Sequence, residues 1–320
     1  MRQLEISWPS IDATVVVDLI EDKNGELTDA VWSCLPYRTL QGHALVAGDC
    51  IYHVPPAHGA LLAAPDHRVD RQAAPLGTVF CSAAQHLTIK YGDLTEPMPA
   101  SPIGVVQDAD VGALPEIGRR VWESVHGQDA PIVAEVRRLG GTTGHAVHRL
   151  LCQSAAVRDL VEEISAHTES ALVEPPDEIL AVHAGRIKSG AGTKQTLLTT
   201  LLFVNGETRP LGYMTYTNLL RAARLTKVPL EALIELTAML VVKPSEFLGY
   251  CGLETLWDLT RRTVDVVSSI TDRSDFAALM SHMALYTNAL GAWNLQLFPW
   301  HLEQSALSDA LSTAATGPRP

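Results

Sequence analysis

Short stretches in which apolar and polar residues alternate dominate the first 140 positions of the chain. This alternation predicts β-strands, because successive side chains of a strand point to opposite faces. We expect a pair of strands around a tight turn at 47–49, and further strands at 4–8, 13–20, 76–82, 87–91, 102–106 and 132–136. Apolar residues at helical spacing predict helices at 26–35 and 114–125. Many short strands with few helices favour a small β-barrel.

From about residue 142 the apolar positions recur at helical spacing instead. We expect helices at 216–224, 230–241, 253–269 and 275–297, with Pro244 at the first position of a helical turn. The sequence therefore predicts an α+β protein in which a barrel domain at 1–140 precedes a helical domain at 141–320.

Composition narrows the class of protein. Hydrophobic residues make up 47% of the 320 positions and charged residues 19%, which is typical of a well-buried globular chain. The net charge of −12 argues against a nucleic-acid partner, since phosphate binding needs a basic surface. No apolar run is long enough for a signal peptide or a membrane span, so we expect no membrane partner and a cytoplasmic location.

Motifs for metals, redox chemistry and nucleotides are missing from the sequence. The five cysteines form no C-x-x-C pair, which favours free thiols. His145 and His148 lie three positions apart, but no third ligand follows them, and no metal site is expected. There is no G-x-G-x-x-G after a strand, no H-E-x-x-H and no G-x-S-x-G. We expect no cofactor.

The densest group of chemically able side chains lies at 37–53, in YRTLQGHALVAGDCIYH. An ordinary hairpin with polar residues on its solvent face is one interpretation. The other is a site in which a guanidinium, an imidazole and a phenol bind a carboxylate and move protons. Pairing about Gly48 would put His43 almost opposite His53, with Arg38 about 16 Å further along the strand. Arg38 and His53 could share a pocket only if the chain bends, and Gly42 is a plausible bulge site.

A family resemblance favours the site. LPYRTLQGHALVAGDCIYHVPP and the later LTIKYGD resemble the cyclophilin-like barrel of cucumopine synthase, whose C-terminal half is similar to the helical domain expected here. Tyr37-Arg38, with His53 fifteen positions after Arg38, resembles the active-site pattern of bacterial Pictet–Spenglerases that make β-carbolines from tryptophan. Those enzymes carry a glutamate about ten positions after the histidine. Here that position is Ala63, and the nearest carboxylate is Asp66.

The resemblance implies a cofactor-independent Pictet–Spengler cyclase with small-molecule partners. It would condense L-tryptophan, or a close relative, with an aldehyde or a 2-oxo acid through an iminium. Asp66 would serve as acid and base, Arg38 would anchor a substrate carboxylate, His53 would orient the carbonyl, and Tyr37 would wall the pocket. The next candidates for the acid are Glu96, Asp49 and Asp93, while His43, Asp49 and Tyr52 are expected to be mostly structural strand residues.

Two other functions stay open. The enzyme could condense histidine with 2-oxoglutarate, as cucumopine synthase does, or the barrel could be a non-catalytic binding module, since such barrels host unrelated activities. A homodimer is expected from the resemblance and from the apolar helical half.

Overall fold

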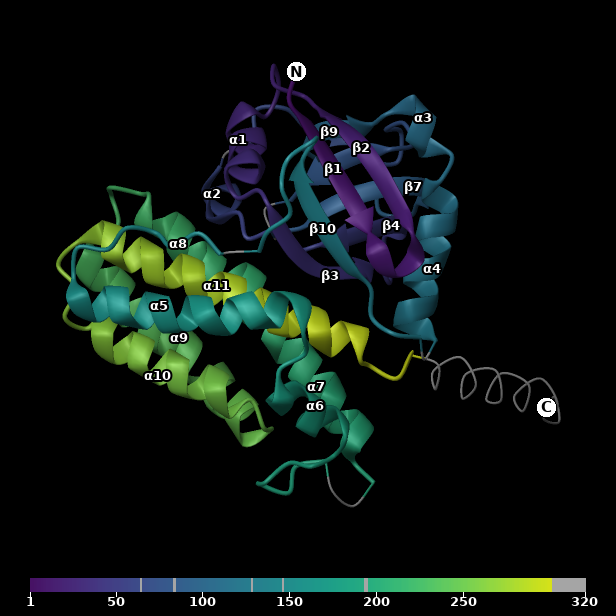
Figure 1. Cartoon of the computed structure of the whole chain (residues 1–320). Coiled ribbons are helices and arrows are strands. Elements are labelled where there is room, and N and C mark those ends of the chain that lie inside the picture. Colours follow the sequence, from purple (N-terminus) through teal and green to yellow (C-terminus); the bar gives the residue numbers. More distant parts are fainter. Residues whose placement is uncertain (64, 83–84, 128, 146, 193–194, 301–320) are drawn as a thin grey trace, which may run out of the picture.

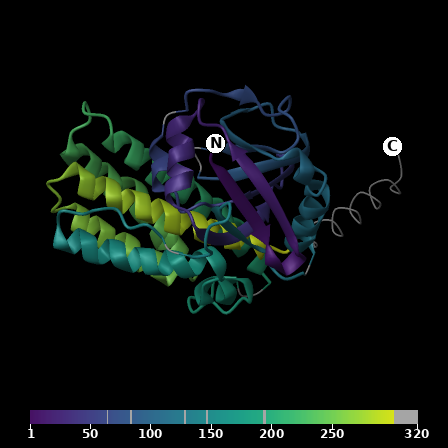
Figure 2. The ribbon, with the colours of Figure 1, turned by 45° about the horizontal axis from the view of Figure 1, so that its top comes forward.

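The computed structural model describes residues 1–300 except 64, 83–84, 128, 146 and 193–194. Residues 301–320, which the sequence assigns to the helical domain, lie outside the described part. Within that part a β-barrel and a set of helices lie side by side, as Figures 1 and 2 show from two directions. The predicted α+β fold, a barrel followed by a helical bundle, is confirmed.

Eight described strands close into a barrel in which every neighbouring pair is antiparallel. Their order around the barrel is β1 (Gln3–Trp8), β10 (Val133–Arg138), β3 (Tyr37–His43), β4 (Gly48–His53), β7 (Leu87–Leu94), β6 (Thr78–Cys81), β9 (Pro102–Val106) and β2 (Ala13–Leu19). Closure leaves these strands without a free sheet edge. A separate small sheet pairs β5 (Val69–Asp70) with β8 (Pro99–Ala100).

The barrel interior holds alternate residues of each strand. Ile6, Val17, Ile51 and Ile89 are among those fully removed from solvent or nearly so. Two helices, α1 (Gly25–Ser33) and α4 (Leu114–His126), add apolar side chains to this core. Three shorter helices also lie in this half of the chain: η1 (Pro9–Ile11), α2 (His58–Leu62) and α3 (Asp108–Val111).

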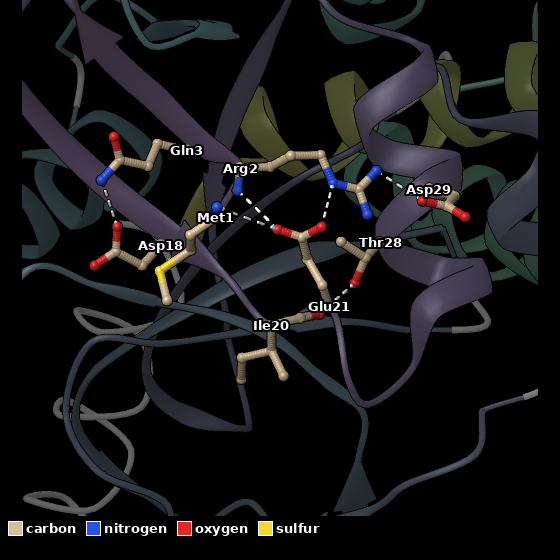
Figure 3. Close-up of polar contacts among 8 residues, drawn as sticks. All are labelled: Met1, Arg2, Gln3, Asp18, Ile20, Glu21, Thr28 and Asp29. Atoms are coloured by element: carbon tan, nitrogen blue, oxygen red, sulfur yellow. Dashed lines mark hydrogen bonds and ion pairs between the residues drawn. The ribbon is translucent and has the colours of Figure 1, made fainter.

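The start of the chain is bound into the barrel wall by polar contacts (Figure 3). The Arg2 guanidinium bridges two carboxylates, 3.2 Å from Glu21 Oε2 and 2.7 Å from Asp29 Oδ1. Gln3 Nε2 donates to Asp18 Oδ1 at 2.7 Å. These contacts join β1 to the end of β2 and to α1. Because they face water, each contributes little alone, and their main effect is to hold the first strand in register.

The second half is built around one long helix, α11 (Arg273–Gln296). It is buried on all sides, as expected of a helix at the centre of a bundle. It packs against α5 (Ala155–Val173), α7 (Leu197–Pro210), the π-helix η2 (Leu211–Tyr216) and α8 (Thr217–Ala223). The remaining helices are α6 (Asp177–His183), α9 (Leu230–Tyr250) and α10 (Glu254–Val267). In Figure 1 the yellow α11 extends from this bundle to a position beneath the barrel.

Two helical expectations need correction. Pro244 does not begin a helical turn, because α9 continues through it from Leu230 to Tyr250. Burial of Val241, Ser245 and Leu248 on one side of α9 outweighs the hydrogen bond that the proline removes. Residues 142–145 and 147–152 are not helical, so His145 and His148 do not share a helix face. The Nδ1 atom of His145 accepts from the Arg38 amide at 3.2 Å.

The apolar core of the helices extends onto the barrel. Leu40 of β3, Val54 after β4 and Leu61 of α2 belong to the same buried cluster as the centre of α11. The domain boundary expected at 140/141 falls in the segment that joins β10 to α5. None of the described helices combines the length and hydrophobicity that a membrane span requires. All five cysteines are free thiols.

Candidate active site

Tyr37 and His53 lie inside the barrel. The Tyr37 hydroxyl is 3.0 Å from His53 Nε2, and both side chains are fully or almost fully buried. Gln41 Nε2 donates to the Tyr52 carbonyl at 2.7 Å, so Gln41 Oε1 must be the atom that accepts from His53 Nδ1 at 3.3 Å and from Trp8 Nε1 at 2.9 Å. His53 Nε2 is then the acceptor for the Tyr37 hydroxyl.

The His53 ring is neutral in this network. Burial lowers the pKa of its imidazole to about 3. Every ring nitrogen and hydroxyl in the chain from Trp8 to Tyr37 has a partner within the barrel. The network therefore stabilises the interior of the barrel, and its four side chains do not together form the wall of an open cavity.

Arg38 and Asp66 lie elsewhere. Arg38 points out of the barrel, is 44% exposed, and pairs with Glu135 of β10 at 3.2 Å. The expected bend at Gly42 is absent: β3 and β4 pair continuously there, Gln41 faces His53, and the irregularity lies between Gly48 and Cys50. The prediction that Arg38 and His53 share a pocket is therefore wrong, because they lie on opposite faces of the barrel wall. Asp66 is exposed after α2.

A cavity of about 260 Å³ lies on the outer face of β4 and β7, where helices cover the barrel. Its lining combines the loop between β3 and β4, outward side chains of β4 and β7, three loop residues and two helix residues: Ala44, Leu45, Val46, Ala47, Cys50, Tyr52, Thr88, Arg71, His86, Glu96, Arg209 and Leu295. A smaller hollow continues from it past Tyr213 and Asn288. Tyr52 was expected to be structural, but its ring forms part of this wall.

Arg71 and Glu96 form the charged pair of the cavity, with Arg71 Nη1 2.6 Å from Glu96 Oε2. The turn that carries Arg71 is held by the buried Lys90 of β7, whose Nζ donates to the carbonyls of Arg71, Gln72 and Ala74 at 3.2, 2.5 and 2.7 Å. Lys90 is 4% exposed, and all three hydrogen bonds of its ammonium group go to backbone carbonyls. It therefore influences the site indirectly, by fixing the backbone of the turn that carries Arg71.

His86 stands between Arg71 and Glu96 in the sequence and immediately precedes β7. Its ring lies 4.6 Å from the Tyr52 ring, centre to centre. Burial, reinforced by the positive charge of Arg209, lowers the pKa of the imidazole to about 3. The ring is therefore neutral at pH 7, with one nitrogen that donates and one that accepts.

The helices hold the loop that carries His86. Gln85 is buried in a left-handed conformation with φ of 61°, and its Oε1 accepts from Asn288 Nδ2 of α11 at 3.0 Å. Asn288 in turn lies against Gly212 of the π-helix, where a Cβ would overlap its amide oxygen. A glycine at this point lets the π-helix approach α11, and π-helical turns are common at functional sites.

The sequence contained a signal for these residues. Two arginines are followed by a histidine fifteen positions later, Arg38 by His53 and Arg71 by His86. Only His86 is followed ten positions later by a glutamate, Glu96. The requirement for an aromatic residue before the arginine selected Arg38. Asp70 precedes Arg71, but the arginine, the histidine and the glutamate of the expected pattern all recur at this second position.

Known proteins are similar to this chain in both halves. The family model described as Cucumopine synthase C-terminal helical bundle domain matches residues 157–297. The solved structure of McbB in complex with tryptophan is 40% identical, with a TM-score of 0.91, and the match covers 95% of this chain and 99% of that chain. The hypothetical protein AF2241 from Archaeoglobus fulgidus, solved in solution, is 18% identical over 43% of this chain and 94% of that chain, with a TM-score of 0.31. No curated protein sequence matches.

Proposed function

Because this chain belongs to the cucumopine synthase-like family that includes McbB, we propose that it is a Pictet–Spengler cyclase. It joins L-tryptophan, or a close relative, to an aldehyde or a 2-oxo acid and gives a tetrahydro-β-carboline. The observation that carries this proposal is the convergence of Arg71, His86 and Glu96 on one cavity between barrel and helices. The tryptophan bound to McbB supports the choice of amine.

The cavity suits an indole substrate. Its volume of about 260 Å³ is near the lower end of small-molecule sites, so it fits a compact ligand. Leu45, Val46 and Leu295 supply apolar surface, and the Tyr52 ring offers a face or edge for an aromatic partner. Enclosing both reactants here would set their orientation and the face of attack.

Glu96 is the acid and base of the proposed reaction. The Glu96 carboxylate takes a proton from the ammonium group of the substrate, and the free amine adds to the carbonyl to give a carbinolamine. The protonated Glu96 then donates this proton to the departing hydroxyl, which leaves as water. The indole carbon C2 then attacks the iminium, and the Glu96 carboxylate removes the proton from that carbon. Release of that proton to solvent returns Glu96 to the ionised form that pairs with Arg71, so the residue ends as it began.

Arg71 and His86 act around this carboxyl group. Arg71 holds one oxygen of Glu96 by a charge-assisted hydrogen bond at 2.6 Å and thereby sets its direction. We assign to the neutral His86, which lines the cavity, a hydrogen bond to the oxygen of the incoming carbonyl. This assignment replaces Asp66, Arg38 and His53 in the roles that the sequence suggested for them.

Product analysis tests the proposed function. The protein is incubated with L-tryptophan and a panel of aldehydes and 2-oxo acids, and separately with histidine and 2-oxoglutarate. We expect a product lighter than the summed reactants by one water, with one configuration in excess over the spontaneous reaction. A stereoselective product from histidine alone would favour the cucumopine-type reaction. No product above background in either arm would favour a binding module.

A homodimer is also proposed. Large apolar side chains lie exposed on α7 and α9, among them Leu202, Phe203, Met239 and Leu240. Phe203 and Phe247 bring the two helices into contact, with ring centres 6.3 Å apart. An apolar face of this kind is typical of an interface between subunits. Light scattering tests this proposal, because it distinguishes a monomer of 34.6 kDa from a dimer of twice that mass. Cofactor independence and a cytoplasmic location stay predictions.

A further inference from the structure

The amine substrate of the proposed function brings a carboxylate into a cavity between the barrel and the helices, where it loses part of its contact with water. A carboxylate in such a place needs a cation or several hydrogen-bond donors to replace its hydration. Two cationic side chains line the cavity, Arg71 from the barrel and Arg209 from the helices. Lys90 lies behind the wall and donates all its bonds to backbone carbonyls.

Arg71 is already committed to Glu96. Its Nη1 makes the 2.6 Å contact with Oε2, and its side chain is 17% exposed. A substrate carboxylate on the same guanidinium would come close to the Glu96 carboxylate, and two like charges at that distance repel. The ion pair therefore leaves Arg71 poorly suited to anchor a second anion.

Arg209 is different. Among the residues that the structure describes it has no ion-pair or hydrogen-bond partner, and its guanidinium lies 5.7 Å from the centre of the Tyr213 ring. It lines both the main cavity and the smaller hollow behind it. The side chain is half-buried, so its charge is partly shielded from solvent without a compensating anion.

Local structure aims Arg209 at the cavity. It is the second-last residue of α7, directly before the π-helix that begins at Leu211. Gly291 of α11 lies beside it, and a Cβ at that position would make ordinary contact with Arg209 Cγ at 3.4 Å. Its charge reaches the two aromatic groups of the wall and lowers the pKa of both His86 and Tyr52, although burial leaves the pKa of Tyr52 raised overall.

We propose that Arg209 binds the α-carboxylate of the amino-acid substrate, so that the helical half recognises the amine and the barrel half carries out the proton transfers. This inference rests on the proposed function. It implies that the site selects amino acids over the corresponding decarboxylated amines, and that this selection depends on the helices.

Calorimetric titration of tryptophan and tryptamine tests the proposal, because tryptamine is the same indole amine without the carboxylate. We expect Arg209→Gln to weaken tryptophan binding by about 10- to 100-fold, as for a lost charge-assisted hydrogen bond, and to change tryptamine binding by less than about 3-fold. Arg209→Lys keeps the charge and should retain most of the affinity. Arg38→Gln is the matched control, since that arginine faces away from the cavity and should bind tryptophan like the wild type.

Kinetics give a second readout. In turnover with an aldehyde, Arg209→Gln should raise KM for tryptophan far more than it lowers kcat. Unchanged tryptophan affinity in a folded Arg209→Gln protein, or an equal loss for tryptophan and tryptamine, would overturn this proposal alone. A wild-type protein that binds no tryptophan would overturn the proposed function as well, which separates the two failures.

Discussion

Replacement of Glu96 by glutamine is the sharpest test of the proton chemistry. Glutamine keeps the shape of the side chain but can neither donate a proton to the departing hydroxyl nor remove the ring proton. Among the residues that the structure describes, Glu96 is also the one carboxylate that lines the cavity, so no described neighbour there can take over. General acid–base catalysis contributes about 10²- to 10⁴-fold, which corresponds to about 3 to 5 kcal/mol of barrier.

The same substitution should hardly affect the fold. The Glu96 side chain is 35% exposed and its ion pair with Arg71 is partly solvated, so its loss should cost less than about 1 kcal/mol of stability. We therefore expect Glu96→Gln to lose kcat with little change in Tm. The assay is the initial rate of chiral product formation, with Tm from calorimetry on the same samples.

Asp66→Asn is the matched control, since Asp66 is the carboxylate that the sequence favoured and it lies exposed outside the cavity. It should react at the wild-type rate. Two results would refute the assignment of Glu96. The first is a Glu96→Gln protein that keeps more than about a tenth of the wild-type kcat, because loss of general acid–base catalysis has a larger effect than that. The second is an Asp66→Asn protein that loses as much activity as Glu96→Gln.

Three further predictions concern the supports of the site. Tyr37→Phe leaves His53 Nε2 buried without a donor, so we expect a loss of about 1 to 3 kcal/mol in urea unfolding with kcat unchanged; a loss of kcat at constant stability would contradict this. Because the pKa of His53 falls from 6.5 unfolded to about 3 folded, the unfolded state takes up its proton first as the pH drops below 6.5. The free energy of unfolding should then fall by about 2 kcal/mol for this group between pH 7 and 5, and an unchanged value over that window would be evidence against it. Lys90→Met removes the donor to three carbonyls around Arg71, and we expect both kcat and Tm to fall. Full activity would show that the turn keeps its conformation without Lys90.

Much of the fold could be predicted from the sequence, since its two periodicities are strong. The strands expected at 13–20 and 102–106 correspond to Ala13–Leu19 and Pro102–Val106. The two-residue strands Val69–Asp70 and Pro99–Ala100 are too short to leave a pattern of alternation. Helix α7 was missed, and it exposes Leu198, Leu202 and Phe203, so its apolar residues do not form a single stripe.

The site was harder to predict, because alternation identifies a strand but does not always show which of its two faces points into the barrel. Polar residues are expected to face outward, yet Gln41 and His53 face the barrel interior, where hydrogen bonds satisfy them. Tyr52, one position away, faces the cavity instead. Arg71, His86 and Glu96 come from three loops, which the pairing of β4, β7 and β6 brings together only when the barrel closes.

The apolar cluster that Leu40, Val54 and Leu61 share with α11 has a consequence for how the molecule is assembled. A barrel expressed without the helices would expose these apolar side chains to water and would tend to aggregate. Its cavity would also lose the part of the wall that Leu295 forms. The helices without the barrel would lack the partner surface for one end of α11. The two halves differ in architecture but share one apolar core, so we expect them to unfold as one cooperative unit.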